Sequence, residues 1–144
     1  MKEFPMQDFT YQIMAMQSLA HQQLLRGLTH TELSTGQPKV LAYLKSHEGQ
    51  RQKTIAQACQ LEPSSLTVLL NRMEKQGMIS RRHQSDDRRS LSVYLTDYGR
   101  SLATQVVERF YEVERAALSG ISPEDESVFE RVCKQILENL KLED

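Results

Sequence analysis

Long apolar runs and paired cysteines are what this sequence has least of. The apolar runs in its 144 residues are all short, which excludes a membrane-spanning helix of about 20 apolar residues. The first residues, MKEFPMQDF, lack a charged segment followed by an apolar one, so we expect no secretory signal and a cytoplasmic protein. The two cysteines, Cys59 and Cys133, lie far apart without a Cys-x-x-Cys spacing, which argues against a disulfide framework or a zinc finger. We expect both to be buried structural side chains.

Repeats, low-complexity tracts and long linkers rich in Pro, Gly or Ser are also missing from the sequence. Because no such break interrupts the chain, we expect residues 1–144 to form one domain. The hydrophobic content of 39% suffices for a core that needs no metal or disulfide. We therefore expect no cofactor.

An overall excess of positive charge, which binding to duplex DNA would favour, is missing because the net charge is −1. The charge is nevertheless unevenly distributed. Between residues 71 and 89, six basic residues stand against three acidic residues, a net charge of +3. From residue 108 onward, ten acidic residues stand against five basic residues, a net charge of −5. The first of these segments is therefore a local positive patch.

Apolar residues at helical spacing predict six helices, at about 9–28, 34–47, 52–60, 63–76, 97–118 and 122–140. Ser34 is the candidate N-cap of the second helix. The fourth helix is bracketed at both ends, because Pro63 suits its first turn and Gly77 suits the left-handed residue just past its end. Thr96 and Ser122 are the expected caps of the fifth and sixth helices.

An alternating pattern interrupts the helices before the fifth one. It predicts two strands of a hairpin, MISRR at 78–82 and SLSVYL at 90–95, joined by a polar tip at 83–89. Two short helices followed directly by a small hairpin are the order of a winged helix-turn-helix. The expected fold is therefore mainly α with a small β-hairpin wing. Residues 34–96 would form the DNA-binding lobe, between the helical segments 1–33 and 97–144.

The fourth helix is expected to be the recognition helix, because its two faces differ in chemistry. Its apolar side is made by Leu66, Leu69, Leu70 and Met73. The opposite side carries Ser64, Val68, Asn71, Arg72 and Lys75. Hydroxyl, amide and basic side chains bind base edges and phosphates, and a valine can pack on a thymine methyl. An ordinary solvated face is the alternative interpretation.

The hairpin tip carries the sequence Asp86-Asp87-Arg88-Arg89. An arginine on such a protrusion can enter a narrow minor groove, where the negative potential is strongest. A neighbouring carboxylate, Asp87, can fix its rotamer. The alternative is a solvated turn that carries a salt bridge.

These motifs together resemble those of the MarR family of bacterial transcription factors. The resemblance runs from GQPKVL at 36–41 through EPSSLT at 62–67 and NRME at 71–74 to the wing pattern D-x-R at 87–89, which is followed by L-T-x-x-G at 95–99. It implies a sequence-specific regulator of transcription, a repressor relieved by a small-molecule effector, that binds a pseudo-palindromic operator as a homodimer. The resemblance implies that the N-terminal helix and the last two helices interleave in that dimer, so that residues 1–33 and 97–144 form a helical dimerisation region.

The resemblance also assigns roles to single residues. It implies that Arg89 reaches the minor groove, that Asp87 orients it, and that Arg88 lies between them. On the recognition helix it implies DNA contacts by Ser64, Ser65, Thr67, Val68 and Arg72. Val68 stands where many relatives carry arginine or another polar residue, which favours an apolar contact. Glu62 stands where relatives often carry a serine cap, and it must point away from the phosphates.

Other classes of function have weaker support in the sequence. An enzyme needs a nucleophile with its base or a set of metal ligands, whereas the histidines are scattered: His21, His30, His47 and His83. A metal-sensing regulator of the same fold is conceivable, with His21, His30 and Glu32 as ligands. A winged helix used only for protein contacts would be expected to lose the basic wing, which this sequence keeps.

An effector cleft is the remaining expectation. Relatives bind small aromatic or lipophilic compounds between the dimer region and the DNA-reading lobe. Candidates for lining such a cleft here are Met14, Tyr43, Phe110 and Tyr111. The alternative is that these are ordinary core side chains.

Overall fold

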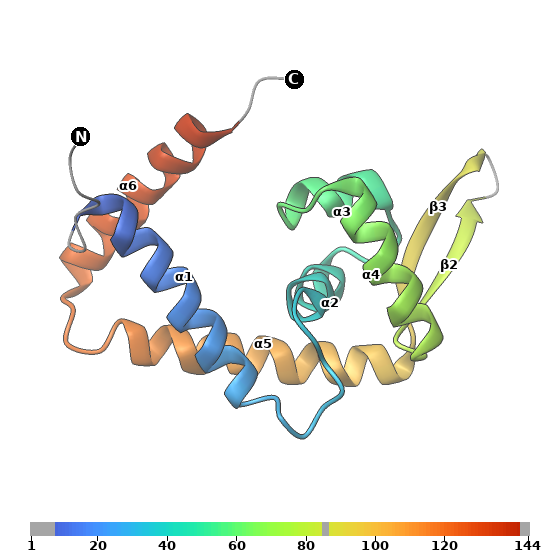
Figure 1. Cartoon of the computed structure of the whole chain (residues 1–144), viewed down its shortest axis with the longest axis horizontal. Helices are drawn as coiled ribbons and strands as arrows, with labels where there is room; N and C mark the ends of the chain where they lie inside the picture. The colour runs from blue at the N-terminus through green and yellow to red at the C-terminus, as the bar shows by residue number, and fades with distance from the viewer. Residues whose placement is uncertain (1–7, 85–86, 142–144) are drawn as a thin grey trace. The chain divides into compact units, whose positions relative to one another are not determined.

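The computed structural model describes residues 8–84 and 87–141 of the chain (Figure 1), and the side chains of Asp87 and Arg88 also lie outside its described part. The elements follow in the order α1 (Phe9–Arg26), α2 (Gln37–Ser46), β1 (Gln50–Arg51), α3 (Gln52–Ala58), α4 (Pro63–Lys75), β2 (Ile79–Gln84), β3 (Asp87–Leu95), α5 (Asp97–Ala117) and α6 (Pro123–Leu140). The chain divides into two compact units, Met1–Tyr111 and Glu112–Asp144, with the division inside α5. The predicted class, mainly α with a hairpin wing, is confirmed.

The start of the second helix differs from the prediction. α2 begins at Gln37 with Gly36 as its N-cap, and Ser34 does not cap it. Ser34 lies instead in a turn, where its carbonyl accepts a hydrogen bond from the backbone N–H of Gln37 at 3.1 Å. Gly36 follows with φ of 90°, a conformation that favours glycine. The turn at 34–36 therefore delays the start of the helix by two residues.

The sheet is larger than the predicted hairpin. β2 and β3 reach Gln84 and Asp87 respectively, so both strands extend into the expected tip at 83–89, with a register irregularity between His83 and Gln84. Polar residues continue these strands because backbone hydrogen bonds, rather than side-chain burial, hold an exposed hairpin end. A third strand, β1, pairs antiparallel with β3 and gives the order β1-β3-β2. Its two residues are too few to show a period in the sequence.

The core of the first unit lies where the helices of the lobe meet the base of the hairpin. The buried side chains come from each part of this unit: Leu24, Leu28, Val40, Leu41, Leu44, Ile55, Ala56, Cys59, Leu66, Leu70, Met73, Met78, Ile79, Val93, Leu95, Leu102, Ala103 and Val106. Gly99 fits here closely, because a Cβ at this position would lie 1.9 Å from the carbonyl oxygen of Met78. The core thereby fixes α4 and the hairpin base in one lobe.

The second unit consists of the end of α5 and the helix α6. The hydroxyl of Ser122 accepts a hydrogen bond from the backbone N–H of Asp125 at 3.1 Å, which confirms the predicted cap. Three acidic residues occupy the first turn of α6, where their negative charges stabilise the helix by interacting with the positive end of its dipole. No residue of α6 within its described range is buried. Its apolar side chains are therefore open to solvent in the single chain.

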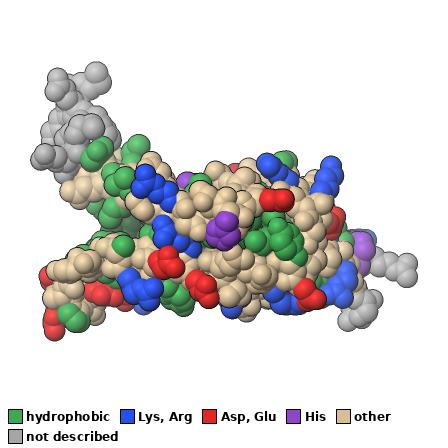
Figure 2. All heavy atoms as spheres, turned by 90° about the horizontal axis from the view of Figure 1, so that it is seen from below, with side chains coloured by type: hydrophobic (Ala, Val, Ile, Leu, Met, Phe, Trp, Pro, Cys, Tyr) green, Lys and Arg blue, Asp and Glu red, His purple; other side chains and the backbone are tan. Residues whose placement is uncertain are grey.

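No helix within residues 8–84 and 87–141 is both long and apolar enough to cross a membrane. Figure 2 shows one face of the molecule, on which hydrophobic side chains reach the surface between charged side chains of both signs.

Candidate nucleic-acid interface

The apolar side of α4 fixes the orientation of this helix in the lobe. Leu66, Leu70 and Met73 are fully buried, and Leu69 packs against the core while half-buried. α4 begins at Pro63 and is followed by Gly77, whose φ of 77° is left-handed. Both predicted ends of this helix are therefore confirmed. Glu62 is its N-cap by position, but its side chain makes no cap hydrogen bond and is exposed.

The opposite side of α4 faces solvent along its whole length. All seven predicted recognition residues are exposed there: Ser64, Ser65, Thr67, Val68, Asn71, Arg72 and Lys75. Val68 is 71% exposed, so its methyl groups are accessible to a thymine methyl. The structure thus brings the predicted recognition residues together on one accessible surface.

Thr67 is exposed, but its hydroxyl is hydrogen-bonded to other groups of the lobe. It donates a hydrogen bond to the carbonyl of Pro63 at 3.0 Å, one helical turn earlier. It also accepts one from the side-chain amide of Gln52 at 3.5 Å, which joins the first turn of α3 to the second turn of α4. The polar group of Thr67 therefore helps to place the recognition helix within the lobe.

Arg81 of β2 reaches back to α4, which the sequence analysis did not anticipate. Its guanidinium donates hydrogen bonds to the amide oxygen of Asn71 at 2.8 Å and to both carboxylate oxygens of Glu74, at 3.1 and 3.3 Å. The backbone N–H of Arg81 donates to the same carboxylate at 3.2 Å. A signal was present in the pattern, because Arg81 lies two residues after the buried Ile79 and so shares its face of the strand.

The contact with Arg81 changes the pKa of Glu74. The hydrogen bond from the Arg81 side chain lowers the pKa of the Glu74 carboxyl below its ordinary value, while partial burial acts in the opposite direction. Glu74 therefore stays ionised at neutral pH. Arg81 contributes less to the positive patch than its sequence position suggested, because its charge is paired with Glu74.

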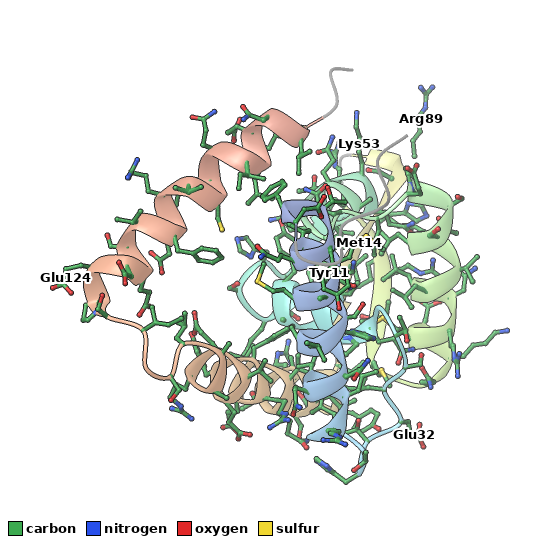
Figure 3. The ribbon with its side chains drawn as sticks, turned by 60° about the vertical axis from the view of Figure 1, so that its left-hand side comes forward. Tyr11, Met14, Glu32, Lys53, Arg89 and Glu124 are labelled. Carbon is green, nitrogen blue, oxygen red and sulfur yellow. The ribbon has the colours of Figure 1, made fainter. Side chains whose placement is uncertain are left out.

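The wing presents its basic residues on an extended hairpin. Arg89 lies on β3, and Figure 3 shows its side chain extending away from the ribbon. Arg89 is exposed. The predicted contact between Arg89 and Asp87 stays a prediction, as does the role of Arg88, because the side chains of Asp87 and Arg88 lie outside the described part.

Arg82 lies on the other face of the wing from Arg81. Its guanidinium carbon lies 3.9 Å from the centroid of the Tyr94 ring, a cation–π contact that holds the arginine along β3. Tyr94 in turn fills the space beside Gly49, where a Cβ would meet its ring at 3.2 Å. The aromatic platform ties the wing to the turn before β1.

The four candidate effector residues are spread over three helices. Met14 on α1 and Tyr111 on α5 are exposed, and Phe110 is 37% exposed. Tyr43 on α2 packs against the core and stacks on the His47 ring, with the centroids 4.4 Å apart. The grouping of these four into one cleft stays a prediction.

The candidate metal ligands do not form a site. Among the residues that the structure describes, no group of three or more His, Cys, Asp or Glu side chains is placed to hold a metal ion. His30 forms a hydrogen bond through Nε2 with Oε1 of Gln105 at 2.7 Å.

Comparison with known proteins agrees with this geometry. The MarR family model matches residues 33–91, the segment from the turn before α2 into β3. The chain is 33% identical over 115 residues to the HTH-type transcriptional regulator YfiV of Bacillus subtilis (strain 168), a match that covers 78% of this chain and 72% of that relative. It is 30% identical over 94 residues to the HTH-type transcriptional repressor MdtR of the same strain, covering 65% of this chain and 61% of the relative.

A solved structure shares the fold over almost the whole chain. It is a MarR family regulator from Listeria monocytogenes in complex with 26mer DNA, with a TM-score of 0.87 at 16% identity, covering 94% of this chain and 90% of that one. At this identity the likeness concerns the fold. Together with the YfiV match, the family model and the exposed recognition face, it shows that the chain belongs to the MarR family of winged helix-turn-helix transcriptional regulators.

Proposed function

We propose that the chain is a sequence-specific repressor that binds duplex DNA as a homodimer. The observation that carries this proposal is the pairing of two surfaces in one lobe, the exposed polar face of α4 and the basic hairpin that ends near Arg89. The helix has the side chains that bind base edges in a major groove, and the hairpin has the charge that a minor groove attracts. The fold also suits DNA binding, because the Listeria regulator of the same fold was crystallised with DNA.

Repression and effector control extend this proposal. MdtR, which is similar over 65% of this chain, is named a repressor. A dimer that covers an operator blocks transcription by occupying the DNA, and a small molecule that binds the dimer can release it. A regulator of this kind acts where the chromosome lies, so we place the chain in the cytoplasm. It needs no catalytic step, and we propose that it is not an enzyme.

The test separates the wing from the helix. We expect Arg89→Ala to weaken binding to every duplex and to reduce the salt dependence by about one ion, because one phosphate or minor-groove charge contact is lost. The measurement is fluorescence anisotropy over a salt series, with a duplex selected from a randomised pool and a scrambled duplex of the same composition. Arg131→Ala, which removes one exposed arginine from α6, is the matched control and should change neither quantity.

Changes on the helix should act differently. Replacement of Val68 or Ser65 should alter which duplex is preferred, by about 1–3 kcal/mol per lost contact, and leave the salt slope nearly unchanged. If Arg89→Ala binds both duplexes as tightly as the parent protein, the wing does not touch DNA. If the parent protein shows no salt-sensitive binding to any duplex, the proposed function itself is wrong.

A further inference from the structure

Arg81 makes the contacts that join β2 to the exposed half of α4. Its side chain is 14% exposed, whereas that of Glu74 is 41% exposed. Its guanidinium binds Asn71 and Glu74, which lie three residues apart and therefore on the same side of the helix. A planar fork with several donors can hold two acceptors in fixed positions, which the single ammonium of a lysine does less well. The arginine is thus bonded to the helix at two successive points.

Arg81 lies near the base of β2, so its contact with α4 can set the direction in which the wing extends. The strand is buried at Ile79 and partly buried at Ser80 and Arg81, and from Arg82 to Gln84 it is exposed. A strand rises about 3.3 Å per residue, so about 10 Å of hairpin extends past Arg81. A tilt of the strand by about 15° at Arg81 would therefore displace the end of the hairpin, near Arg89, by about 3 Å, which is about the length of a hydrogen bond.

The same contact sets what Asn71 presents to DNA. An asparagine that reads adenine uses its amide oxygen as acceptor and its NH2 group as donor at once. In this protein the oxygen of Asn71 accepts a hydrogen bond from Arg81. One of the two lone pairs of that oxygen is thereby used, so the NH2 group is the part of Asn71 that is most open to DNA. Such a donor suits a phosphate oxygen or a base acceptor better than the paired donor and acceptor of adenine.

We propose that Arg81 is a positioning residue, which sets the spacing between the recognition helix and the wing and turns Asn71 into a hydrogen-bond donor toward DNA. The proposal rests on the DNA-binding function proposed above, and it concerns a residue that makes no DNA contact itself. It explains why an arginine of the positive patch is turned inward onto Glu74 rather than outward to solvent. Arg81 acts through the two surfaces that it joins.

The first test needs no DNA. We compare Arg81→Met, which keeps the length of the side chain but removes its donors, with Arg82→Met, which removes the same charge one residue later. Amide hydrogen exchange measured by mass spectrometry should quicken in Arg81→Met both in the strand 79–84 and in the second half of α4. Arg82→Met should leave α4 unchanged. Unchanged exchange in both segments of Arg81→Met would overturn the proposal whether or not the chain binds DNA.

The second test measures coupling on DNA, with the duplex selected by the parent protein from a randomised pool. We expect Arg81→Met to bind this duplex about tenfold more weakly while its melting temperature stays within a few degrees. Arg89→Ala should cost much less affinity in the Arg81→Met background than in the parent protein, because Arg89 on a tilted wing no longer reaches the minor groove. Arg81→Lys, which keeps the charge but loses the fork, should restore only part of the affinity.

The outcomes separate the two proposals. Equal costs of Arg89→Ala in the two backgrounds, with normal DNA binding by the parent protein, would mean that Arg81 only stabilises the fold, and the positioning role would be wrong. A parent protein that binds no duplex would overturn the DNA-binding function, and the hydrogen-exchange comparison would still decide whether Arg81 joins the wing to the helix.

Discussion

Single side chains show how burial decides chemistry in this protein. Cys59 is buried at the end of α3, with its sulfur 3.8 Å from the carbonyl oxygen of Lys39. Burial raises the pKa of its thiol, and the positive charge of Lys39 acts more weakly in the opposite direction. The thiolate is the reactive form of cysteine, so Cys59 stays protonated and inert at neutral pH. The predicted structural role is consistent with this environment, whereas Cys133 on α6 is only half-buried.

A labelling experiment checks this difference. In a Cys133→Ala variant we expect the remaining Cys59 to react with a thiol reagent at pH 7 at least about tenfold more slowly than it does after unfolding in urea, because the buried neutral thiol is a poor nucleophile. In Cys59→Ala, the remaining Cys133 should react faster than Cys59 wherever a second copy of the chain does not cover α6, because its thiol is only half-buried in the single chain. Fast labelling of Cys59 in the folded protein would contradict the structural role.

The contacts of Arg81 could not be predicted from the sequence, whereas the exposure of the residues on α4 could. The exposed face of α4 follows from helical periodicity alone, and every residue predicted for it is exposed. Periodicity does not say which of these side chains bind each other across elements. The bonds from Arg81 to Asn71 and Glu74 join residues ten and seven positions apart, and they form only once the turn at Gly77 has folded the strand back beside the helix.

Helix ends were predictable where one side chain and one turn suffice. Thr96 accepts a hydrogen bond from the backbone N–H of Gly99 at 3.0 Å, as its position before α5 predicts. Ser122, Pro63 and Gly77 also behave as expected. The predicted Ser34 cap was wrong, because the side chain of Gln37 binds the backbone of Ser34 and also the distant Gln76. Gln37, which is fully buried, accepts a hydrogen bond from the backbone N–H of Ser34 at 3.1 Å and donates one to Gln76 at 2.8 Å.

Gln37 therefore joins two elements, the start of α2 and the end of α4. We expect Gln37→Ala to lower the free energy of unfolding by about 1–3 kcal/mol, because it removes the partner of the Ser34 N–H and leaves a cavity in a buried site. Urea unfolding followed by circular dichroism measures this loss. Gln57→Ala, an exposed change on α3, is the control and should stay within about 0.5 kcal/mol. Equal midpoints for the two variants would mean that the buried amide does not contribute.

At the scale of the whole molecule, the winged helix-turn-helix order was readable because each element carries its own local signal. Helical stripes, a bracketed recognition helix and an alternating hairpin follow one another without overlap. The short strand β1 was not predicted, because it is defined only by its pairing with β3. The remaining predictions concern surfaces between molecules, which a single chain shows only by what it leaves exposed.

Exposed apolar side chains mark a surface of this kind on each of the two units. On the second unit and its α6 they are Ile121, Val128, Phe129, Val132, Leu137 and Leu140. On α1 they are Phe9, Ile13, Met14, Met16 and Leu19. An apolar side chain of this size gains about 1.5–3 kcal/mol when it becomes fully buried, and patches of this extent are typical of interfaces. A second copy of the chain is the partner that the family fold favours.

We therefore expect a homodimer in solution, with α1, α5 and α6 buried between two copies. Multi-angle light scattering at micromolar concentration should give twice the chain mass of 16.6 kDa. Phe129→Glu should shift the protein toward monomer and weaken operator binding, because it places a charge in the apolar interface. Lys134→Glu, on the polar side of the same helix, should leave the mass unchanged. A monomeric parent protein would contradict the dimer. It would also remove the two-fold symmetry from which a pseudo-palindromic operator, with half-sites about one helical turn apart, is expected.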